Sequence, residues 1–390
     1  MKRSPKIFSD DDYDKINKEY FEDLRSKGEL LCDPSGWLDT YSRAASIFPD
    51  VPLSRESLAP YCLDEGNALG DMKLKIAGLV SSWEGGRDLS VDEFTLCHSV
   101  STATLTILVL LKRLGIKSVI FETPAYAVTV NQTKYLGLRA RLIPTYLESE
   151  FRAPITEDLV RRNSPCAIWL TQPRMSLGYD QPVDYIAALR CLLSPQDFLV
   201  IDEATEQHFP SHLRHIGSDR NVLRTRGFLK GAGLNGIRLA FILHHDLLRD
   251  QIEATQEVTG SSLEVYSLRA AVEIAEKDGK LAEMLRLSNS QTTSLRERAE
   301  KVAFGSKLKV SRLVNGYIGS FFLDLSSLSG THEEKRQKFL SFCRSKKMPV
   351  ILGSGMRFAY SPGREFVRAN YYNRDFHILW GVSNMVDFLS

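Results

Sequence analysis

Short apolar runs alternate with longer stretches of helical periodicity between residues 94 and 245. The apolar runs predict buried strands over residues 94–97, 118–122, 167–171 and 197–201. Residues 103–114 repeat apolar side chains at helical spacing and predict a helix. Strands that alternate with helices are typical of a mostly parallel sheet with helices on both faces. We therefore predict an α/β fold for this part of the chain.

The flanking regions have different patterns. Residues 250–305 predict long helices that lead to a smaller C-terminal domain beginning near Lys307. In that domain we expect strands at 316–325 and 365–371, with a helix over 331–346 between them. Near the N-terminus, the acidic residues 10–14 predict the start of a helix that continues past Tyr20. We therefore divide the chain into an N-terminal arm or small-domain part over 1–60, a large domain over 61–305 and a small α+β domain over 306–390.

Composition narrows the class of protein. A chain of 390 residues with 43% hydrophobic content can bury a large core in two domains. The net charge of +2 gives no reason to expect nucleic acid or a membrane surface as a partner. The six cysteines include no Cys-x-x-Cys pair, and several lie in apolar runs, as buried free thiols of a reducing compartment do. No apolar signal segment follows the N-terminus and no apolar run approaches 18 residues, so we expect a cytoplasmic protein.

One lysine has an unusual setting. Lys230 lies between a predicted strand end at 222–223 and another predicted strand over 237–243. Three glycines between residues 231 and 236 permit tight turns and close approach of the backbone to a ligand. An amine that loses hydration in such a site has a lower pKa and becomes a nucleophile suited to Schiff-base chemistry. The alternative is a solvated lysine in a surface loop.

A carboxylate and an arginine accompany this lysine. Asp202, 28 residues before Lys230, ends a predicted strand, and strand ends of open α/β sheets are where ligands bind. Arg238 follows Lys230 within Gly233-Leu-Asn-Gly-Ile-Arg238. The Asp202-Glu-Ala204 segment, the lysine and this Gly-Leu-x-Gly-x-Arg segment resemble those of class I/II aminotransferases, which are pyridoxal 5′-phosphate (PLP) enzymes of fold type I. The resemblance extends from about Tyr61 to the C-terminus.

The resemblance implies a fold and a chemistry. It implies a large α/β domain of PLP fold type I, a smaller C-terminal α+β domain, PLP as cofactor, and a homodimer with its active site at the subunit boundary. Lys230 would hold PLP as a Schiff base, release it to an incoming α-amino acid and then remove the α-proton. Asp202 would keep the pyridine nitrogen protonated. Tyr126, in a Pro-x-Tyr segment, would stack on the ring, although a core tyrosine is the alternative.

Other residues match the family's anion-binding positions. Ser99, Val100 and Ser101 lie between a predicted strand and a helix, where free backbone N–H groups and the helix dipole favour a phosphate. The resemblance assigns them and Arg238 to the cofactor phosphate. A serine that caps the helix without a ligand is the alternative. Arg368, within a β pattern, matches the arginine that grips the substrate's α-carboxylate, with an exposed strand arginine as the alternative.

The sequence departs from the family pattern in the cofactor's phenolate contacts. Met175 stands where the family has an asparagine, and Thr205 stands where it often has a tyrosine. Both family residues donate to the phenolic oxygen of the cofactor. Gln172, Arg174, Thr205 itself or His208 are the candidates to replace them. A site with fewer donors would stabilise the phenolate less and shift the coupled proton equilibrium.

Two phosphate contacts of the family are also replaced. Gly227-Phe-Leu229 precedes the lysine where the family commonly has serines, and we consider Arg226 as a substitute. Glu65 stands near the place of a tyrosine that reaches the partner subunit's phosphate in the family.

Three functions remain open from the sequence. The first is an aminotransferase acting on an amino or keto acid. The second is an aminotransferase-like enzyme that performs β- or γ-elimination and ring closure on a functionalised amino acid, which the changes at Met175 and Thr205 favour. The third is a non-catalytic descendant that binds PLP or a partner protein. Retention of the lysine, the aspartate and both arginines argues against the third.

Overall fold

The computed structural model describes residues 15–36, 40–51, 67–145, 152–216, 219–260, 263–311, 315–353 and 364–390, with only the backbone described for 15–18 and 67–70. Its strands are β1 (Phe94–Cys97), β2 (Ser118–Glu122), β3 (Arg139–Ile143), β4 (Cys166–Thr171), β5 (Phe198–Asp202), β6 (Val222–Gly227), β7 (Ala240–Leu243), β8 (Leu308–Val310), β9 (Ile318–Asp324) and β10 (Arg364–Asn370). Its α-helices are α1 (Lys15–Ser26), α2 (Asn67–Trp83), α3 (Val100–Arg113), α4 (Ala127–Tyr135), α5 (Glu157–Asn163), α6 (Val183–Cys191), α7 (Arg249–Gly260), α8 (Val265–Ala275), α9 (Lys280–Ala303), α10 (His332–Ser345) and α11 (Asp375–Leu389). Short 3₁₀ helices are η1 (Arg43–Ile47), η3 (Val91–Glu93) and η5 (Asp246–Leu248).

A seven-stranded sheet forms the centre of the larger unit. Its strand order is β1-β7-β6-β5-β4-β2-β3, and only β7 runs antiparallel to its neighbours among the strands described. This confirms the predicted mostly parallel sheet. The register pairs Thr171 with Asp202 and Asp202 with Thr225, so β4, β5 and β6 end together at one edge.

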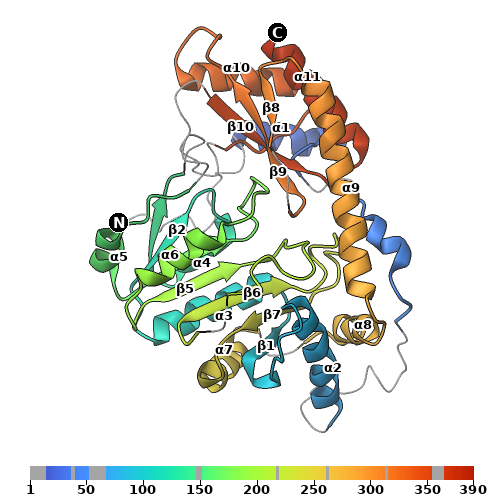
Figure 1. Cartoon of the computed structure of the whole chain (residues 1–390). Helices are drawn as coiled ribbons and strands as arrows, with labels where there is room; N and C mark the ends of the chain where they lie inside the picture. The colour runs from blue at the N-terminus through green and yellow to red at the C-terminus, as the bar shows by residue number, and fades with distance from the viewer. Residues whose placement is uncertain are drawn as a thin grey trace.

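Helices cover both faces of this sheet (Figure 1). On one face, α3, α4 and α7 bury apolar residues such as Val119, Val200 and Leu223. On the other, α5 and α6 cover the β2–β4–β5 part, while α2 and α8 cover β1 and β7. The alternate residues Val200 and Ile201 lie in different clusters because successive strand side chains point to opposite faces. A strand buried on both faces therefore reads as a continuous apolar run, as β5 does.

The smaller unit is built on an antiparallel sheet of order β10-β9-β8. Helices α9, α10 and α11 supply residues to its core, including Leu295, Phe339 and Ile378. The long helix α9 extends from the larger unit to this sheet (Figure 1). Helix α1 packs against α10, and Asp33 N donates to His377 Nδ1 at 3.0 Å, so the described residues 15–36 lie on the smaller unit.

Asn315 joins the two units just before β9. Its Nδ2 donates to Asp180 Oδ1 at 2.8 Å and to Glu206 Oε1 at 2.6 Å. Its Oδ1 accepts from Gln207 N at 2.8 Å. The Asn315 side chain is fully buried, so these contacts satisfy its amide in place of water.

Several predicted boundaries are corrected by hydrogen bonding. Strand β6 does not end at residue 223, because Arg224 to Gly227 pair with β7 in register. Strand β7 begins at Ala240 rather than at residue 237. Helix α3 begins at Val100, three residues before the predicted start, because the Ser99 side chain caps it. The short strand β8 was not predicted.

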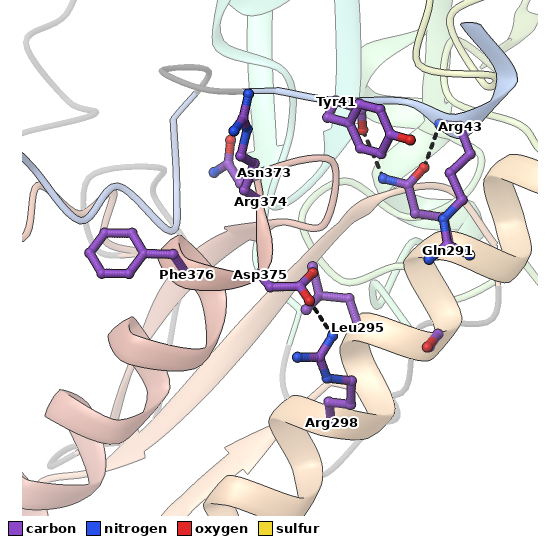
Figure 2. A pocket seen from close by; sticks show the side chains of 10 residues that line it. Tyr41, Arg43, Gln291, Leu295, Arg298, Asn373, Arg374, Asp375 and Phe376 are labelled. Carbon is purple, nitrogen blue, oxygen red and sulfur yellow. Dashed lines mark hydrogen bonds and ion pairs between the residues drawn. The ribbon is translucent and has the colours of Figure 1, made fainter. Parts of the chain in front are cut away.

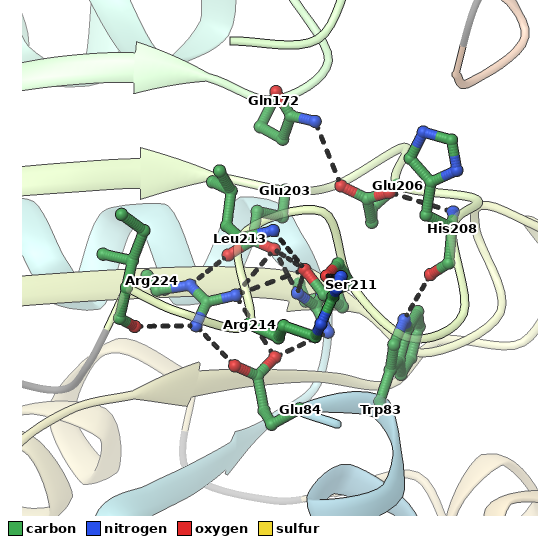
Figure 3. A network of polar contacts seen from close by, with 12 residues as sticks. Trp83, Glu84, Gln172, Glu203, Glu206, His208, Ser211, Leu213, Arg214 and Arg224 are labelled. Atoms are coloured by element: carbon green, nitrogen blue, oxygen red, sulfur yellow. Dashed lines mark hydrogen bonds and ion pairs between the residues drawn. The ribbon is translucent and has the colours of Figure 1, made fainter. Parts of the chain in front are cut away.

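Four charged side chains are buried together beside β5 and β6 (Figure 3). Arg224 Nε contacts Glu203 Oε1 at 2.5 Å, and Arg224 Nη1 contacts Glu84 Oε2 at 2.5 Å. Arg226 pairs with the same two glutamates, and its Cζ lies 4.5 Å from the centroid of the Trp83 ring. Burial opposes ionisation of Glu203, but the two guanidinium groups outweigh it and hold the pKa of that carboxyl below its usual range.

This buried network also settles the place of Arg226. In the register, Asp202 pairs with Thr225, so Arg226 lies on the opposite face of the sheet from Asp202. Its guanidinium is committed to Glu84, Glu203 and the Ser211 hydroxyl, the last at 2.8 Å. The hypothesis that Arg226 replaces a phosphate-binding serine is therefore wrong.

Two further findings concern composition. Cys32, Cys97, Cys166 and Cys343 are buried free thiols, as predicted, whereas Cys191 is exposed. Within the described residues, no helix is long and apolar enough to cross a membrane, and no cluster of three or more His, Cys, Asp or Glu side chains could hold a metal ion.

We predict that Arg226→Met lowers the free energy of unfolding by about 3–5 kcal/mol, because it leaves buried carboxylates with one guanidinium. The matched control is Arg162→Met, since Arg162 makes an exposed ion pair with Asp158 on α5. Such exposed pairs add little stability, so the control should unfold close to the wild type. Urea denaturation followed by circular dichroism measures both. Equal losses in the two variants would contradict a stabilising role for the network.

Candidate functional site

Lys230 lies in a tight turn directly after β6. Phe228 N donates to Leu239 O at 2.9 Å, and Gly233 N donates to Lys230 O at 3.0 Å. The side chains of Phe228 and Leu229 are fully buried in the core against α2 and α8, whereas Lys230 is half-buried. The two residues that replace the family's serines thus anchor the turn by apolar packing.

Hydroxyl groups from distant segments donate hydrogen bonds to the backbone carbonyls of Gly231 and Ala232. Tyr372 Oη donates to Gly231 O at 2.6 Å. Ser42 Oγ and Ser288 Oγ donate to Ala232 O at 2.5 and 2.8 Å. A side chain at position 231 would place its Cβ 2.0 Å from Glu206 O, so only glycine fits there. We call residues 230–234 with these contacts the lysine turn.

Sequence reasoning missed the residues that brace the lysine turn. Ser42, Ser288 and Tyr372 come from η1's N-cap, α9 and the segment after β10. Nothing in the local sequence links these positions. The only available signal was that Tyr372 closely follows the predicted strand that carries Arg368.

The structure brings Asp202, Tyr126 and Arg238 into range of Lys230. The Lys230 Nζ lies 5.9 Å from the centroid of the Tyr126 ring. Burial lowers the pKa of Lys230; the Asp202 carboxylate opposes this, and the Arg238 charge adds to it. Burial raises the pKa of Asp202 to about 6, although Lys230 and the Ala204 N–H favour its ionised form. An amine whose pKa is lowered, beside a buried carboxyl whose pKa is raised, is a combination typical of functional sites.

The start of α3 also lies beside Lys230. A Cβ at Gly227 would lie 2.9 Å from Lys230 Cβ and 3.0 Å from Val100 Cγ2, so glycine at 227 allows both to approach. Ser99 caps the helix, since its Oγ accepts from Thr102 N at 3.2 Å, while Ser101 is exposed. Ser99 therefore acts as the N-cap of α3, which the sequence left open as the alternative to phosphate binding. The first N–H groups of this 14-residue helix have no partner within the helix itself.

Two predicted arginines occupy different settings. Arg238 is exposed, and its backbone N donates to Ser267 Oγ at 2.9 Å. Arg368 is half-buried on β10, where its Nε and Nη2 donate to Ser35 O at 3.1 and 3.0 Å. Burial raises the pKa of Tyr317 well above its usual value; the nearby Tyr126 adds to this, and the Arg368 charge opposes it. Tyr317 therefore lies within electrostatic range of both Tyr126 and Arg368.

Three of the four candidate phenolate donors are committed elsewhere. The amide nitrogen of Gln172 donates to Asp180 Oδ1 at 2.6 Å. It also donates to Glu206 Oε2 at 3.2 Å, as Figure 3 shows. Its amide oxygen accepts from Gln181 N at 2.7 Å. Arg174 and His208 also have partners. Arg174 Nε donates to Gln181 Oε1 at 3.0 Å, and His208 Nε2 bonds Asp180 Oδ2 at 3.0 Å.

Thr205 differs from these candidates. It is half-buried, and a Cβ at Gly316 would lie 3.4 Å from its Oγ1. Its hydroxyl makes no hydrogen bond to any residue in the part of the chain that the structure describes. Of the four candidates, Thr205 is the one whose side chain makes no hydrogen bond within the described residues. Glu65 lies outside the described residues.

These residues fit a PLP group. A buried carboxyl with a raised pKa suits a protonated pyridine nitrogen, and a half-buried amine with a lowered pKa suits covalent attachment. A helix N-terminus beside the lysine suits a phosphate. Tyr126 adds an aromatic ring within reach of the Lys230 amine.

Asp202 generates a prediction about pH and stability in the cofactor-free protein. Its pKa rises from 3.8 to about 6 on folding, so its ionisation destabilises the fold. The contribution of protonated Asp202 to the free energy of unfolding is fully present below the pKa of the unfolded chain. It is lost as the pH rises through about 6. Relative to wild type, Asp202→Asn should therefore gain about 2 kcal/mol of unfolding free energy between pH 4 and pH 7.

The control for this prediction is Asp197→Asn. Burial raises the pKa of Asp197, but hydrogen bonds led by the Ser194 hydroxyl outweigh it and leave the pKa lowered. The contribution of ionised Asp197 to the free energy of unfolding is present above the pKa of Asp197 in the unfolded chain. It is lost as the pH falls through the pKa of Asp197 in the folded protein. The loss caused by Asp197→Asn should therefore shrink towards acid pH. Urea titrations at several pH values measure both; a constant difference for Asp202→Asn would contradict the raised pKa.

Comparisons with known proteins give sequence relatives and structural neighbours. No protein-family model matches the sequence. A histidinol-phosphate aminotransferase of Oleidesulfovibrio alaskensis is 29% identical over 147 residues, which cover 36% of this chain and 38% of that relative. The match therefore spans less than two fifths of the relative's length.

Solved structures match over nearly the whole chain. A double mutant of Thermus thermophilus aspartate aminotransferase has a TM-score of 0.75 at 16% identity, covering 100% of this chain and 97% of that one. A probable N-succinyldiaminopimelate aminotransferase of the same species has a TM-score of 0.73 at 17% identity, covering 95% and 98%. At these identities the likeness shows the shared fold. This chain therefore has the fold that these aminotransferases share, and part of its sequence is similar to histidinol-phosphate aminotransferases.

Proposed function

We propose that this protein is a PLP-dependent, aminotransferase-like enzyme that acts on an α-amino acid through Lys230. The observation that carries the proposal is the setting of Lys230. Its amine has a lowered pKa, lies 5.9 Å from the Tyr126 ring centroid and interacts with the buried Asp202. When bound, PLP supplies an electrophilic carbonyl for amines and a ring that withdraws electrons from the substrate's α-carbon.

The residues around the lysine have distinct proposed roles. Lys230 Nζ would attach the cofactor and later take the proton from the substrate's α-carbon, a role that its lowered pKa favours. Asp202 holds a proton on the ring nitrogen and becomes the buried counter-charge. Tyr126 limits movement of the ring plane. The N–H groups at Ser99, Val100 and Ser101, with Arg238, hold the phosphate.

Arg368 is the proposed carboxylate-binding residue. Ser35 O accepts from both Nε and Nη2, which fixes the plane of the guanidinium. A fixed planar fork recognises a carboxylate with little loss of side-chain entropy. Tyr317 is fully buried and interacts electrostatically with both Arg368 and Tyr126, so we assign it to the wall of the substrate site.

A second function is favoured by one specific observation. Gln172, Arg174 and His208 are bound to other residues, and Thr205 alone of the candidates offers an available hydroxyl for the phenolate. A site with one donor in place of two shifts the proton equilibrium that governs which proton transfer follows. The alternative is therefore a non-transaminating PLP enzyme that performs β- or γ-elimination, with or without ring closure.

Assembly and location are further proposals. We propose a homodimer with the active site at the subunit boundary, on the ground of the family resemblance. Four buried free thiols support a reducing compartment such as the cytoplasm. Sedimentation velocity tests the dimer.

Lys230→Ala should abolish covalent attachment of PLP and lower amino-acid turnover by several orders of magnitude, because the nucleophile and the base are removed together. Borohydride reduction followed by peptide mass spectrometry should locate the cofactor on Lys230 of the wild type. Lys277→Ala, an exposed lysine at the end of α8, is the control and should behave as wild type. Attachment at another lysine would refute the assignment.

Products from a panel of amino acids, with and without an α-keto acid, should separate the two functions. A transaminase should yield a new amino acid only when the keto acid is present. An eliminating enzyme should release a leaving group or a cyclic product in its absence. On the basis of Thr205, we expect slow, incomplete half-reactions with glutamate, aspartate, alanine and arginine. Rapid, complete conversion with any of them would make the protein an ordinary aminotransferase.

A further inference from the structure

One backbone carbonyl next to Lys230 receives two buried side-chain donors. Tyr372 Oη donates to Gly231 O at 2.6 Å, and Gln207 Nε2 donates to the same oxygen at 2.9 Å. Gln207 Nε2 also donates to Tyr372 Oη at 2.9 Å, so the three groups all contact one another. Gln207 is 3% exposed and Tyr372 is 1% exposed, so bulk solvent is excluded from these bonds. We call Gly231 O, Tyr372 Oη and Gln207 Nε2 the carbonyl junction.

Tyr372 connects the carbonyl junction to the strand that carries Arg368. Strand β10 ends at Asn370, and Asn370 Oδ1 accepts from Tyr372 N at 3.1 Å. Arg368 Nε donates to Ser35 O at 3.1 Å. Asn370 N donates to Pro34 O at 2.8 Å. A short, hydrogen-bonded run of backbone therefore separates the proposed carboxylate-binding arginine from the tyrosine of the junction.

Gln207 connects the carbonyl junction to the loop after β5. It lies five residues after Asp202 and two residues after Thr205. The loop and the lysine turn pack directly against each other, because a Cβ at Gly231 would lie 2.0 Å from Glu206 O. The junction thus receives one donor from the segment that follows Asp202 and one from the segment that follows Arg368.

The position of the Lys230 amine depends on the backbone of the lysine turn. The amine ends a flexible stem of four carbons, so the side chain alone does not fix its position. A misplacement of about 1 Å between reacting groups can cost roughly a hundredfold in rate. The Tyr372 ring also lies against the turn, since a Cβ at Gly233 would lie 2.7 Å from Tyr372 Cζ. The ring and the hydroxyl of one tyrosine therefore both contact the turn.

The neighbouring carbonyl of the turn has separate donors. Ser42 Oγ donates to Ala232 O at 2.5 Å. Gln291 on α9 holds the segment of Ser42 in place (Figure 2). Its side chain donates to Tyr41 O at 2.8 Å and accepts from Arg43 N at 2.7 Å. Removal of the tyrosine hydroxyl alone should therefore release one carbonyl of the turn and leave the other held.

We propose that Tyr372 is a positioning residue whose hydroxyl holds Gly231 O, so that the Lys230 amine keeps a fixed place relative to a substrate carboxylate at Arg368. The inference rests on the proposed function, because it takes Lys230 as the base and Arg368 as the carboxylate-binding residue. In this role Tyr372 acts through the lysine turn and not on the substrate. Burial raises the pKa of Tyr372, so its hydroxyl keeps the proton that it donates.

Hydrogen exchange of the cofactor-loaded protein tests the hold on the turn. Gly233 N donates to Lys230 O at 3.0 Å, so the Gly233 amide reports opening of the turn. Tyr372→Phe keeps the ring and removes the donor, and the peptide with this amide should exchange about fivefold faster, as for loss of one buried hydrogen bond. Peptides of β5 and β9 should exchange as in the wild type. Unchanged exchange at Gly233, or equal acceleration in all peptides, overturns the proposal.

The matched control is Tyr371→Phe. Tyr371 adjoins Tyr372 and is fully buried in the core of the smaller unit, but its hydroxyl has no hydrogen-bond partner within the described residues. Its removal breaks no bond, so exchange at Gly233 and steady-state kinetics should stay close to wild type. Equal acceleration at Gly233 in the two variants would contradict a specific role of the Tyr372 hydroxyl.

Steady-state kinetics tests the consequence for Lys230. Tyr372→Phe should lower kcat about tenfold and keep KM for the amino acid within about twofold, because the base is displaced while Arg368 stays in place. Arg368→Gln should instead raise KM, because it removes the carboxylate-binding group. A raised KM with unchanged kcat in Tyr372→Phe would place the effect of the hydroxyl at Arg368 and overturn the proposal.

The exchange and kinetic measurements separate failure of the positioning role from failure of the proposed function. A wild-type protein without turnover of amino acids refutes the proposed function, while exchange at Gly233 still decides whether Tyr372 holds the turn. An active wild-type enzyme whose Tyr372→Phe variant keeps normal exchange and normal kcat refutes the positioning role alone.

Discussion

The juxtaposition of a buried carboxyl with a half-buried amine is the constraint on which the site depends. Asp202 and Lys230 each lose hydration, and each favours the charged form of the other. Their positions follow from adjacent strands, since β5 ends at Asp202 and β6 leads into the lysine turn. On the opposite face, the buried Arg–Glu network joins the same two strands. Charged interactions on both faces of the sheet therefore hold the ends of β5 and β6 in place.

The fold class could be predicted from the sequence because a strand buried on both faces appears as a continuous apolar run. The apolar runs at β2, β4 and β5 predict central strands, and the structure places all three inside the large sheet. Lys230, Asp202 and Tyr126 were identified through motif spacing, and the structure brings them together.

Contacts between distant segments could not be predicted in the same way. Arg226 was misread because a buried arginine on a strand has no local sign of the glutamates, Glu84 and Glu203, that neutralise it. The brace of the lysine turn was missed because Ser42 and Ser288 are far from residue 232 in sequence. Serine is common in loops and on helices, so neither position stood out. Such contacts are set by tertiary packing, which periodicity and propensity do not encode.

Asn315 has a mechanical consequence. It is the first described residue of the smaller unit after residue 311, and it bonds Asp180, Glu206 and the backbone of Gln207. A swing of the smaller unit that kept these bonds would pivot there, so atoms near Asn315 would hardly move. Residues far from the pivot, such as those of α10, would travel furthest. The region around Thr205 would keep its shape in such a motion, because Asn315 bonds the adjacent residues Glu206 and Gln207.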